Sequence, residues 1–241
     1  MVLHDNARGP SLSRRALLGA VGSGCLAAIL AGCESAAPLP EGDGRVRLGD
    51  NRPLPVPRQV SPPAAVVVPQ ASTYGIIPRS AWARAGPAAN KLEPMNGVSR
   101  ITFHHSGDPH PFSTTDYAQT AQHLEDIRED HHNNRRWADI GYHFAIDRAG
   151  RVWQLRSLAY QGSHVESHNE HNVGIVVLGN FDLQSMSAAQ KEKVQTFGRL
   201  VRRQYALSIA QIKTHQEIRK TECPGDEMQP FMVAVRNKGM I

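Results

Sequence analysis

A histidine and a cysteine near the end of the chain carry the strongest chemical signal in the sequence. His215 and Cys223 are separated by Gln-Glu-Ile-Arg-Lys-Thr-Glu, and Pro224-Gly225 follows. If this loop returns on itself, it places an imidazole and a thiolate on one side of a metal ion. Zinc favours nitrogen and sulfur ligands, and a catalytic zinc site uses three protein ligands with water in the fourth position.

The third ligand must come from elsewhere in the chain, which contains twelve histidines. Most of them lie in polar stretches, where we expect solvated side chains. His104 is the natural candidate because it ends a predicted strand. Spacing alone would be weak support, since one histidine and one cysteine at this separation also arise by chance. Five histidines stand at strand ends or beside turn residues: His104, His105, His143, His164 and His215.

Five segments have the composition of strands that would position these groups. Residues 100–104 are β-branched and aromatic and end on the histidine pair. Residues 173–178 form a nearly continuous apolar run, which is typical of a central strand covered on both faces. A hairpin is predicted around Arg148-Ala149-Gly150, and a short strand leads into His215. These three strands span residues 142–147, 151–155 and 209–213.

Three segments have the spacing of helices. The first begins after Ser113 or Thr114, either of which can cap it. The second opens with a capping box between Ser187 and Gln190, and the third spans about 229–237. Because strands alternate with helices around one apolar strand, we expect an α/β fold. It would be a single domain with a central mixed β-sheet and helices on both faces.

Aromatic residues and prolines divide the chain. All fourteen aromatic residues lie at Tyr74 or beyond, and eight of the sixteen prolines fall between Pro38 and Pro69. A stretch that lacks aromatic residues and is interrupted by proline cannot bury enough apolar surface to offset the entropy of ordering. We therefore predict a folded unit over residues 74–241 and a disordered, Pro-rich tether over residues 33–73.

The first 32 residues have the features of an export signal. The pair Arg14-Arg15 precedes a short apolar run, which is typical of twin-arginine signals. The run ends in Leu30-Ala31-Gly32-Cys33, which resembles the bacterial lipobox, whose cysteine is acylated and becomes the mature N-terminus. We therefore expect residues 1–32 to be a signal peptide and Cys33 to anchor a cell-envelope lipoprotein in the membrane. An ordinary cleaved leader or a signal anchor is the alternative.

Charge and cysteine content limit the classes of partner. The formal net charge is +5, and no block of Lys and Arg is long enough to hold nucleic-acid phosphates. Three cysteines are too few for a disulfide framework, so Cys223, which lies alone in the predicted folded unit, needs another role. We expect an exported monomer that faces the periplasm. Glu34, which follows Cys33, would permit sorting to an outer membrane.

Seven segments of the chain form a collinear set of motifs. They are Arg79-Ser-Ala-Trp82, Thr102-Phe-His-His-Ser106, Trp137-Ala-Asp-Ile-Gly-Tyr-His-Phe144, Gly162-Ser-His164, Asn172-Val-Gly-Ile175, Gly179-Asn-Phe181, and Thr214-His215 with Thr221-Glu-Cys-Pro-Gly225. In order and spacing they resemble the family of peptidoglycan recognition proteins and phage-lysozyme-type amidases, the N-acetylmuramoyl-L-alanine amidases of the second type. One segment would be weak support, but seven in sequence over about residues 76–225 are specific.

The resemblance implies a zinc amidase that acts on peptidoglycan. It places one zinc ion per domain on His104, His215 and Cys223. It places the family's tyrosine near the metal at Tyr142, and the family's Lys or Thr position, two residues before the metal cysteine, at Thr221. The implied reaction is hydrolysis of the amide bond between the lactyl group and L-alanine, in which zinc lowers the pKa of a bound water and polarises the carbonyl.

Further residues implied by the resemblance border this site. His164 and Asn172 fall in segments beside the family's substrate groove, although residues 162–164 could equally be a simple tight turn. His105 or His143 could orient a ligand, although packing or solvation is the commoner fate of such a histidine. The chain departs from a related cytosolic branch at residues 174–177, which contain no glutamate, so this strand supplies no carboxylate base.

Two other functions remain as alternatives. Members of the family that only recognise peptidoglycan commonly lack the metal cysteine, so Cys223 favours an enzyme over a non-catalytic peptidoglycan-binding lipoprotein. A zinc peptidase that cuts between amino acids of the stem peptide is the third hypothesis.

Overall fold

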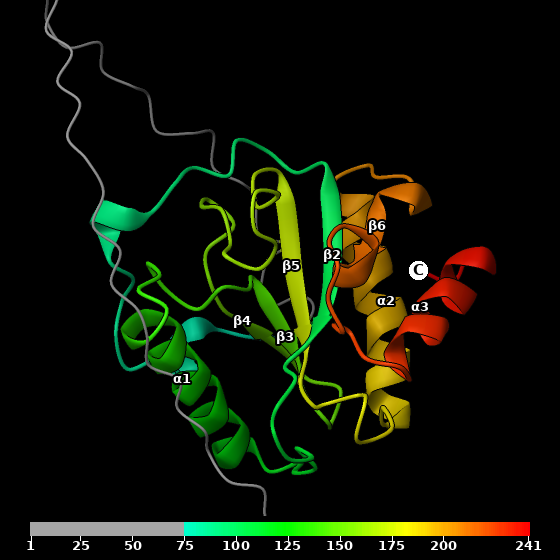
Figure 1. The fold of residues 1–241 in the computed structure, drawn as a ribbon, viewed down its shortest axis with the longest axis horizontal. Helices are drawn as coiled ribbons and strands as arrows, with labels where there is room; N and C mark the ends of the chain where they lie inside the picture. The colour runs from blue at the N-terminus through cyan, green and yellow to red at the C-terminus, as the bar shows by residue number, and fades with distance from the viewer. Residues whose placement is uncertain (1–74) are drawn as a thin grey trace, which may run out of the picture. The chain divides into compact units, whose positions relative to one another are not determined.

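Six strands form one mixed β-sheet in the computed structural model, which describes residues 75–241 (Figure 1). Their order is β1-β4-β3-β5-β2-β6, and β3–β4 is the antiparallel pair in this sheet. The strands are β1 (Ile76–Ile77), β2 (Arg100–His105), β3 (Phe144–Ile146), β4 (Val152–Gln154), β5 (Asn172–Val177) and β6 (Ile212–Thr214). The signal peptide (1–32), the tether (33–73) and the lipidation of Cys33 fall outside the described residues and stay predictions from the sequence.

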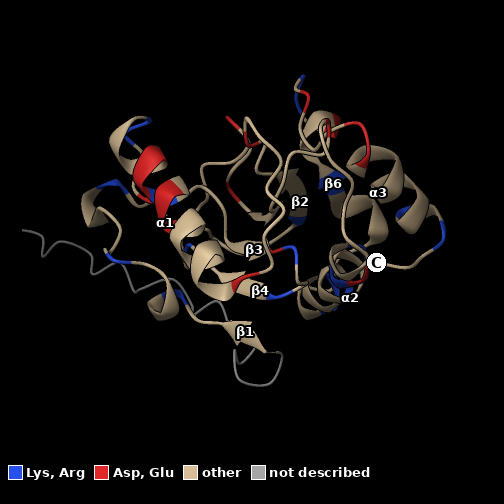
Figure 2. Cartoon of the chain, turned by 90° about the horizontal axis from the view of Figure 1, so that it is seen from below, with Lys and Arg blue, Asp and Glu red and all other residues tan. Residues whose placement is uncertain are grey.

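Helices cover both faces of the sheet. α1 (Tyr117–Asn133) lies over one face, and α2 (Ala188–Gln204) and α3 (Met228–Asn237) lie over the other, as Figure 1 and Figure 2 show from two directions. The predicted α/β fold with a mixed sheet between helices is therefore confirmed. No helix within residues 75–241 is long and apolar enough to cross a membrane.

Two buried clusters hold these layers together. On the face covered by α2 and α3, Phe103 of the sheet packs in one cluster with Phe197 and Met232. On the face covered by α1, Val176 packs in the other cluster with Leu124. Full burial of such a side chain stabilises the fold by about 1.5–3 kcal/mol. The core is therefore divided by the sheet. The strands β3, β4 and β5 contribute to both halves, because successive side chains of a strand point to opposite faces.

The starts of two helices show how the local sequence sets their limits. The Ser187 hydroxyl accepts a hydrogen bond from the Gln190 amide at 3.0 Å, and the Gln190 side chain accepts from the Ser187 amide at 3.0 Å, which confirms the predicted capping box. α1 is capped instead by Asp116, whose carboxylate accepts from the Gln119 amide at 2.8 Å. The cap predicted two or three residues earlier was wrong, because an aspartate nearer the first turn serves equally well.

Two elements of the sheet differ from the sequence prediction. Residues 209–211, predicted as part of a strand, form a 3-10 turn, and β6 begins only at Ile212. β1 was not predicted, because two residues offer no alternating pattern to detect. Although β6 is short, it still delivers His215 directly after its last residue, Thr214.

The predicted hairpin is present and depends on one buried carboxylate. β3 and β4 are antiparallel, and Asp147 follows β3 at the start of the turn. Asp147 is fully buried, and its carboxylate accepts four hydrogen bonds of 2.6–3.0 Å. The donors are the Ala149 amide, the amide and Nε of Arg151, and the indole of Trp153. Since an unpaired buried donor costs about 1–3 kcal/mol, both the turn and the tryptophan rely on this group.

We expect Asp147→Ala to lower the free energy of unfolding by about 3 kcal/mol or more, because it leaves buried donors without an acceptor. Asp147→Asn should be nearly as harmful, since its NH2 group would face other donors. Urea unfolding measures both variants. The control is Asp130→Asn, which removes a half-exposed ion pair with Arg135 and should cost less than about 1 kcal/mol. A similarly small loss in Asp147→Ala would show that the turn does not need the carboxylate.

Candidate metal centre

The carboxyl ends of β2 and β6 and the loop before α3 bring three side chains together. One ligand atom from each of His104, His215 and Cys223 lies within 4.8 Å of the other two. Sγ of Cys223 is 3.6 Å from Nδ1 of His104, and the centroids of the two histidine rings are 4.8 Å apart. The Gln216 amide donates to the Cys223 carbonyl at 3.0 Å. The loop between the two predicted ligands therefore does return on itself.

The chemistry of these three groups, which we call the trio, fits zinc. Two imidazole nitrogens and one sulfur are the ligand types of a catalytic zinc site with an open fourth position. Burial lowers the pKa of His104 and of His215, so both rings are neutral near pH 7 and offer a lone pair. Burial raises the pKa of the Cys223 thiol to about 12, opposed by a hydrogen bond from the His105 backbone. A bound cation must therefore displace the thiol proton.

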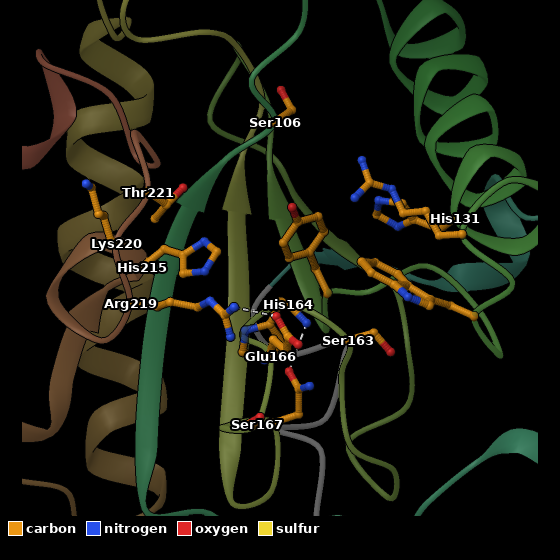
Figure 3. Close-up of a pocket in the computed structure, with 14 residues that line it drawn as sticks. Ser106, His131, Ser163, His164, Glu166, Ser167, His215, Arg219, Lys220 and Thr221 are labelled. Atoms are coloured by element: carbon orange, nitrogen blue, oxygen red, sulfur yellow. Dashed lines mark hydrogen bonds and ion pairs between the residues drawn. The ribbon is translucent and has the colours of Figure 1, made fainter. Parts of the chain in front are cut away.

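Two predicted polar side chains stand beside the trio. The ring of Tyr142 is 5.1 Å from that of His104 between centroids. Burial raises the pKa of the Tyr142 hydroxyl, so this group stays protonated and can donate a hydrogen bond. The Thr221 hydroxyl accepts from the Cys223 amide at 3.3 Å. Tyr142 and Thr221 line the same cavity as His215, and Figure 3 shows Thr221 next to His215.

This cavity has a volume of about 660 Å³, and most of its lining side chains are polar. Arg135 and Trp137 border it on the side of α1, and Arg219 and Lys220 border it from the loop between two trio residues. Arg219 forms an ion pair of 2.6 Å with Glu166, drawn in Figure 3. These charged residues were not predicted from the sequence. The sequence could have indicated Arg219 and Lys220, because they lie between His215 and Cys223 and a loop between two ligands must border the metal.

The two residues predicted beside the substrate groove take different positions. His164 lines the cavity, but its ring is buried and its Nδ1 lies 3.0 Å from Nε2 of His104. The structure does not bring Asn172 to the cavity. Its side chain is fully buried, accepts from the Thr102 hydroxyl at 2.8 Å and donates to the His168 carbonyl at 2.8 Å. The geometry therefore gives the Asn172 side chain no access to substrate.

His105 and His143, which the sequence offered as orienting groups, are held elsewhere. Nδ1 of His105 accepts from the Phe181 amide at 3.2 Å. Nδ1 of His143 accepts from the Gly174 amide at 2.9 Å, and its Nε2 lies 3.0 Å from a backbone carbonyl oxygen. Among the hydrogen bonds of residues 75–241, neither ring contacts a member of the trio. Both histidines instead join the sheet to its neighbouring loops.

Fold and site together define a class of protein, an α/β domain with a two-histidine, one-cysteine centre at the carboxyl edge of its sheet. Residues 91–226, more than half of the chain, match the family model described as N-acetylmuramoyl-L-alanine amidase. The chain belongs to this family, and the resemblance inferred from the seven motifs is confirmed.

Relatives of this chain carry two kinds of name. Peptidoglycan-recognition protein SC2 of Drosophila melanogaster is 30% identical over 151 residues, which cover 62% of this chain and 80% of that protein. The N-acetylmuramoyl-L-alanine amidase of Homo sapiens is 26% identical over 160 residues, which cover 64% of this chain and 27% of the human protein. A mutant of Drosophila PGRP-LB, solved in complex with tracheal cytotoxin, has a TM-score of 0.56 at 25% identity and matches 63% of this chain and 89% of its own. The family relates this chain to peptidoglycan but includes both recognition proteins and amidases.

Proposed function

We propose that this protein is a zinc-dependent N-acetylmuramoyl-L-alanine amidase, which hydrolyses the amide bond between the lactyl group and L-alanine of peptidoglycan. The observation that carries the proposal is the convergence of His104, His215 and Cys223 beside Tyr142 at a polar cavity. Membership of the amidase family supports it. One zinc ion per domain, held by the trio, would activate water and polarise the scissile carbonyl.

Tyr142 is the residue best placed to stabilise the developing charge. Its hydroxyl is protonated because burial raises its pKa, so it can donate a hydrogen bond to the oxyanion that forms on the carbonyl oxygen. The Thr221 hydroxyl, which also lines the cavity, can assist with a second hydrogen bond. The proposed hydrolysis uses no carboxylate side chain from residues 174–177 of β5, which contain none.

The charge of the cavity supports a peptidoglycan fragment as its occupant. Arg135, Arg219 and Lys220 in the lining outnumber the acid Glu166. Stem peptides carry carboxylates, so a surplus of cations favours them over neutral or basic peptides. The PGRP-LB mutant was solved in complex with tracheal cytotoxin, which is a monomeric diaminopimelic acid-type peptidoglycan, and this complex supports the same class of ligand.

A peptidoglycan-binding protein without catalysis is the second candidate, since the relative SC2 is named as a recognition protein. The complete trio favours the enzyme, because recognition alone has no need of a sulfur ligand beside two histidines. A zinc peptidase that cuts between stem amino acids would use the same trio. The bound metal and the reaction products therefore have to be measured separately.

We expect the purified protein to contain one zinc ion per chain by elemental analysis. Loss of a residue that only orients a metal ligand typically lowers metal affinity about 10–100-fold. Cys223→Ala removes a ligand itself, so it should lower the zinc affinity at least ~100-fold and abolish amidase activity. The matched control is His110→Ala, an exposed histidine outside the cavity, which should keep its zinc. Absence of tightly bound zinc, or a Cys223→Ala protein that keeps both metal and activity, would contradict the assignment.

The bond that is cut can be identified by mass spectrometry of digested peptidoglycan. We expect intact stem peptides with a free L-alanine amine, together with glycan strands that carry free lactyl carboxylates. Cleavage between stem amino acids would instead identify a peptidase, and binding without release of fragments by zinc-loaded protein would identify a recognition protein. A parallel digest with Cys223→Ala controls for contaminating hydrolases.

Tyr142→Phe removes one hydroxyl and keeps the ring, so zinc content and stability should be nearly unchanged. If the hydroxyl stabilises the oxyanion, its loss should cost ~2–4 kcal/mol, about a hundred- to a thousandfold in rate. The effect should fall on kcat more than on KM, because the bond matters chiefly once charge develops. Tyr117→Phe, which removes an exposed hydroxyl on α1, is the control. Unaltered turnover in Tyr142→Phe would exclude this role.

A further inference from the structure

Behind the candidate ligand His104 lies a second enclosed imidazole. Nε2 of His104 is 3.0 Å from Nδ1 of His164, and the two rings meet edge to face with an interplanar angle of 83°. Nε2 of His164 is in turn 3.1 Å from the backbone carbonyl oxygen of Asn172. His104 is 1% exposed and His164 is 6% exposed, so protein groups rather than solvent are the partners of these nitrogens.

The carbonyl oxygen determines where the protons lie along this hydrogen-bond chain. Because a carbonyl only accepts, Nε2 of His164 must carry the proton. A neutral imidazole has one N–H, so Nδ1 of His164 is an acceptor, and Nε2 of His104 must donate to it. His104 therefore keeps its lone pair on Nδ1, which is the nitrogen 3.6 Å from Sγ of Cys223.

We propose that His164 is a positioning residue, which fixes the tautomer and the ring orientation of His104 so that Nδ1 faces the metal. This inference rests on the proposed zinc site, and it replaces the substrate contact that the sequence predicted for His164. Metal-bound histidines are generally oriented by a hydrogen bond to their second nitrogen. Here the orienting group is itself an imidazole, whose own orientation is set by a backbone carbonyl.

Two glycines make the space for the His164 ring. A Cβ atom on Gly162 would lie 2.4 Å from Cδ2 of His164, and a Cβ atom on Gly174 would lie 2.5 Å from the same carbon. Carbon atoms in contact normally stay about 3.5–4.0 Å apart, so a side chain at either position would displace the ring. Gly174 stands inside β5, where glycine weakens a strand. The close approach of His164 accounts for it.

The acceptor at the end of the chain of hydrogen bonds is equally fixed. Asn172 is the first residue of β5 and is paired with Arg100 of β2. Its side chain joins the Thr102 hydroxyl to the His168 carbonyl. These contacts hold the backbone at Asn172, so its carbonyl stays directed at His164. Asn172 thus contributes to the site through its backbone carbonyl, which contacts the nitrogen of the His164 ring that faces away from His104.

Both tautomers can be observed in the metal-free, full-length protein by long-range 1H–15N NMR of labelled histidines, with His104→Ala used to assign the His104 signals. We expect His104 and His164 both to be in the Nε2–H form. A wild-type His104 in the Nδ1–H form would overturn the proposal. Because this measurement needs no metal, it is independent of the zinc analysis, in which failure of the proposed function would appear.

Variants of His164 separate positioning from substrate contact. His164→Ala removes the acceptor and should let the His104 tautomers mix, with zinc affinity about 10–100-fold lower in competition with a chelating dye. His164→Asn places an amide oxygen near the position of Nδ1 and should restore most of the affinity. His164→Gln carries its amide one carbon further and should not. His110→Ala serves again as the control.

Two outcomes would show that His164 does something else. If His164→Ala keeps wild-type zinc affinity and only the KM for peptidoglycan rises, His164 is a substrate contact and the proposal is wrong. Equal zinc affinities in His164→Asn and His164→Gln would also contradict it, because only the first can accept from His104. If His164→Ala fails to fold, the comparison of His164→Asn with His164→Gln and the wild-type tautomers still decide whether His164 positions His104.

Discussion

The parallel pairing of β2 with β6 on one side and β5 on the other is the constraint on which the site depends. Parallel strands end at the same edge of a sheet, and Phe103 of β2 is in register with Thr214 of β6. The next residues, His104 and His215, therefore emerge side by side. A slip of one residue would exchange the faces of β2, and His105 rather than His104 would then lie on the side of His215 and Cys223. The register thus selects one histidine of an adjacent pair.

The elements that the sequence predicted are those set by local chemistry. The apolar run of β5, the hairpin turn around Gly150 and the capping box at Ser187 each depend on residues that are neighbours in the chain. The strand it missed depends on a distant partner, and the strand it misplaced is shortened by a local turn that begins with a capping box between Ser208 and Gln211. β1 has two residues and exists because Ile76 pairs with Val152 of β4, and β6 is cut short where residues 209–211 turn. No periodicity in the sequence encodes the existence of β1 or the residue at which β6 begins.

The candidate site shows the same division. The trio and Tyr142 were inferred from motifs, and the structure brings them together. The contact between His104 and His164 spans 60 residues and depends on the orientation of two rings, which no spacing encodes. Asn172 was assigned to the groove because it lies in a motif of the family. Its place at the start of a fully buried strand made that role for its side chain unattainable.

Arg156 links the two segments of the chain that carry Tyr142 and His164. Its guanidinium donates at 2.6–2.8 Å to three backbone carbonyls, those of Asp139, Ile140 and Gln161. Burial lowers the pKa of Arg156 to about 10, which still leaves it protonated near pH 7, so all three charge-assisted bonds persist. Two of the carbonyls belong to the segment that leads into Tyr142, and the third belongs to the segment that leads into His164. Arg156 does not line the cavity itself. A buried cation therefore ties the segment before Tyr142 to the segment before His164. Because all three acceptors are backbone carbonyls, this link does not depend on the side chains of the residues it joins.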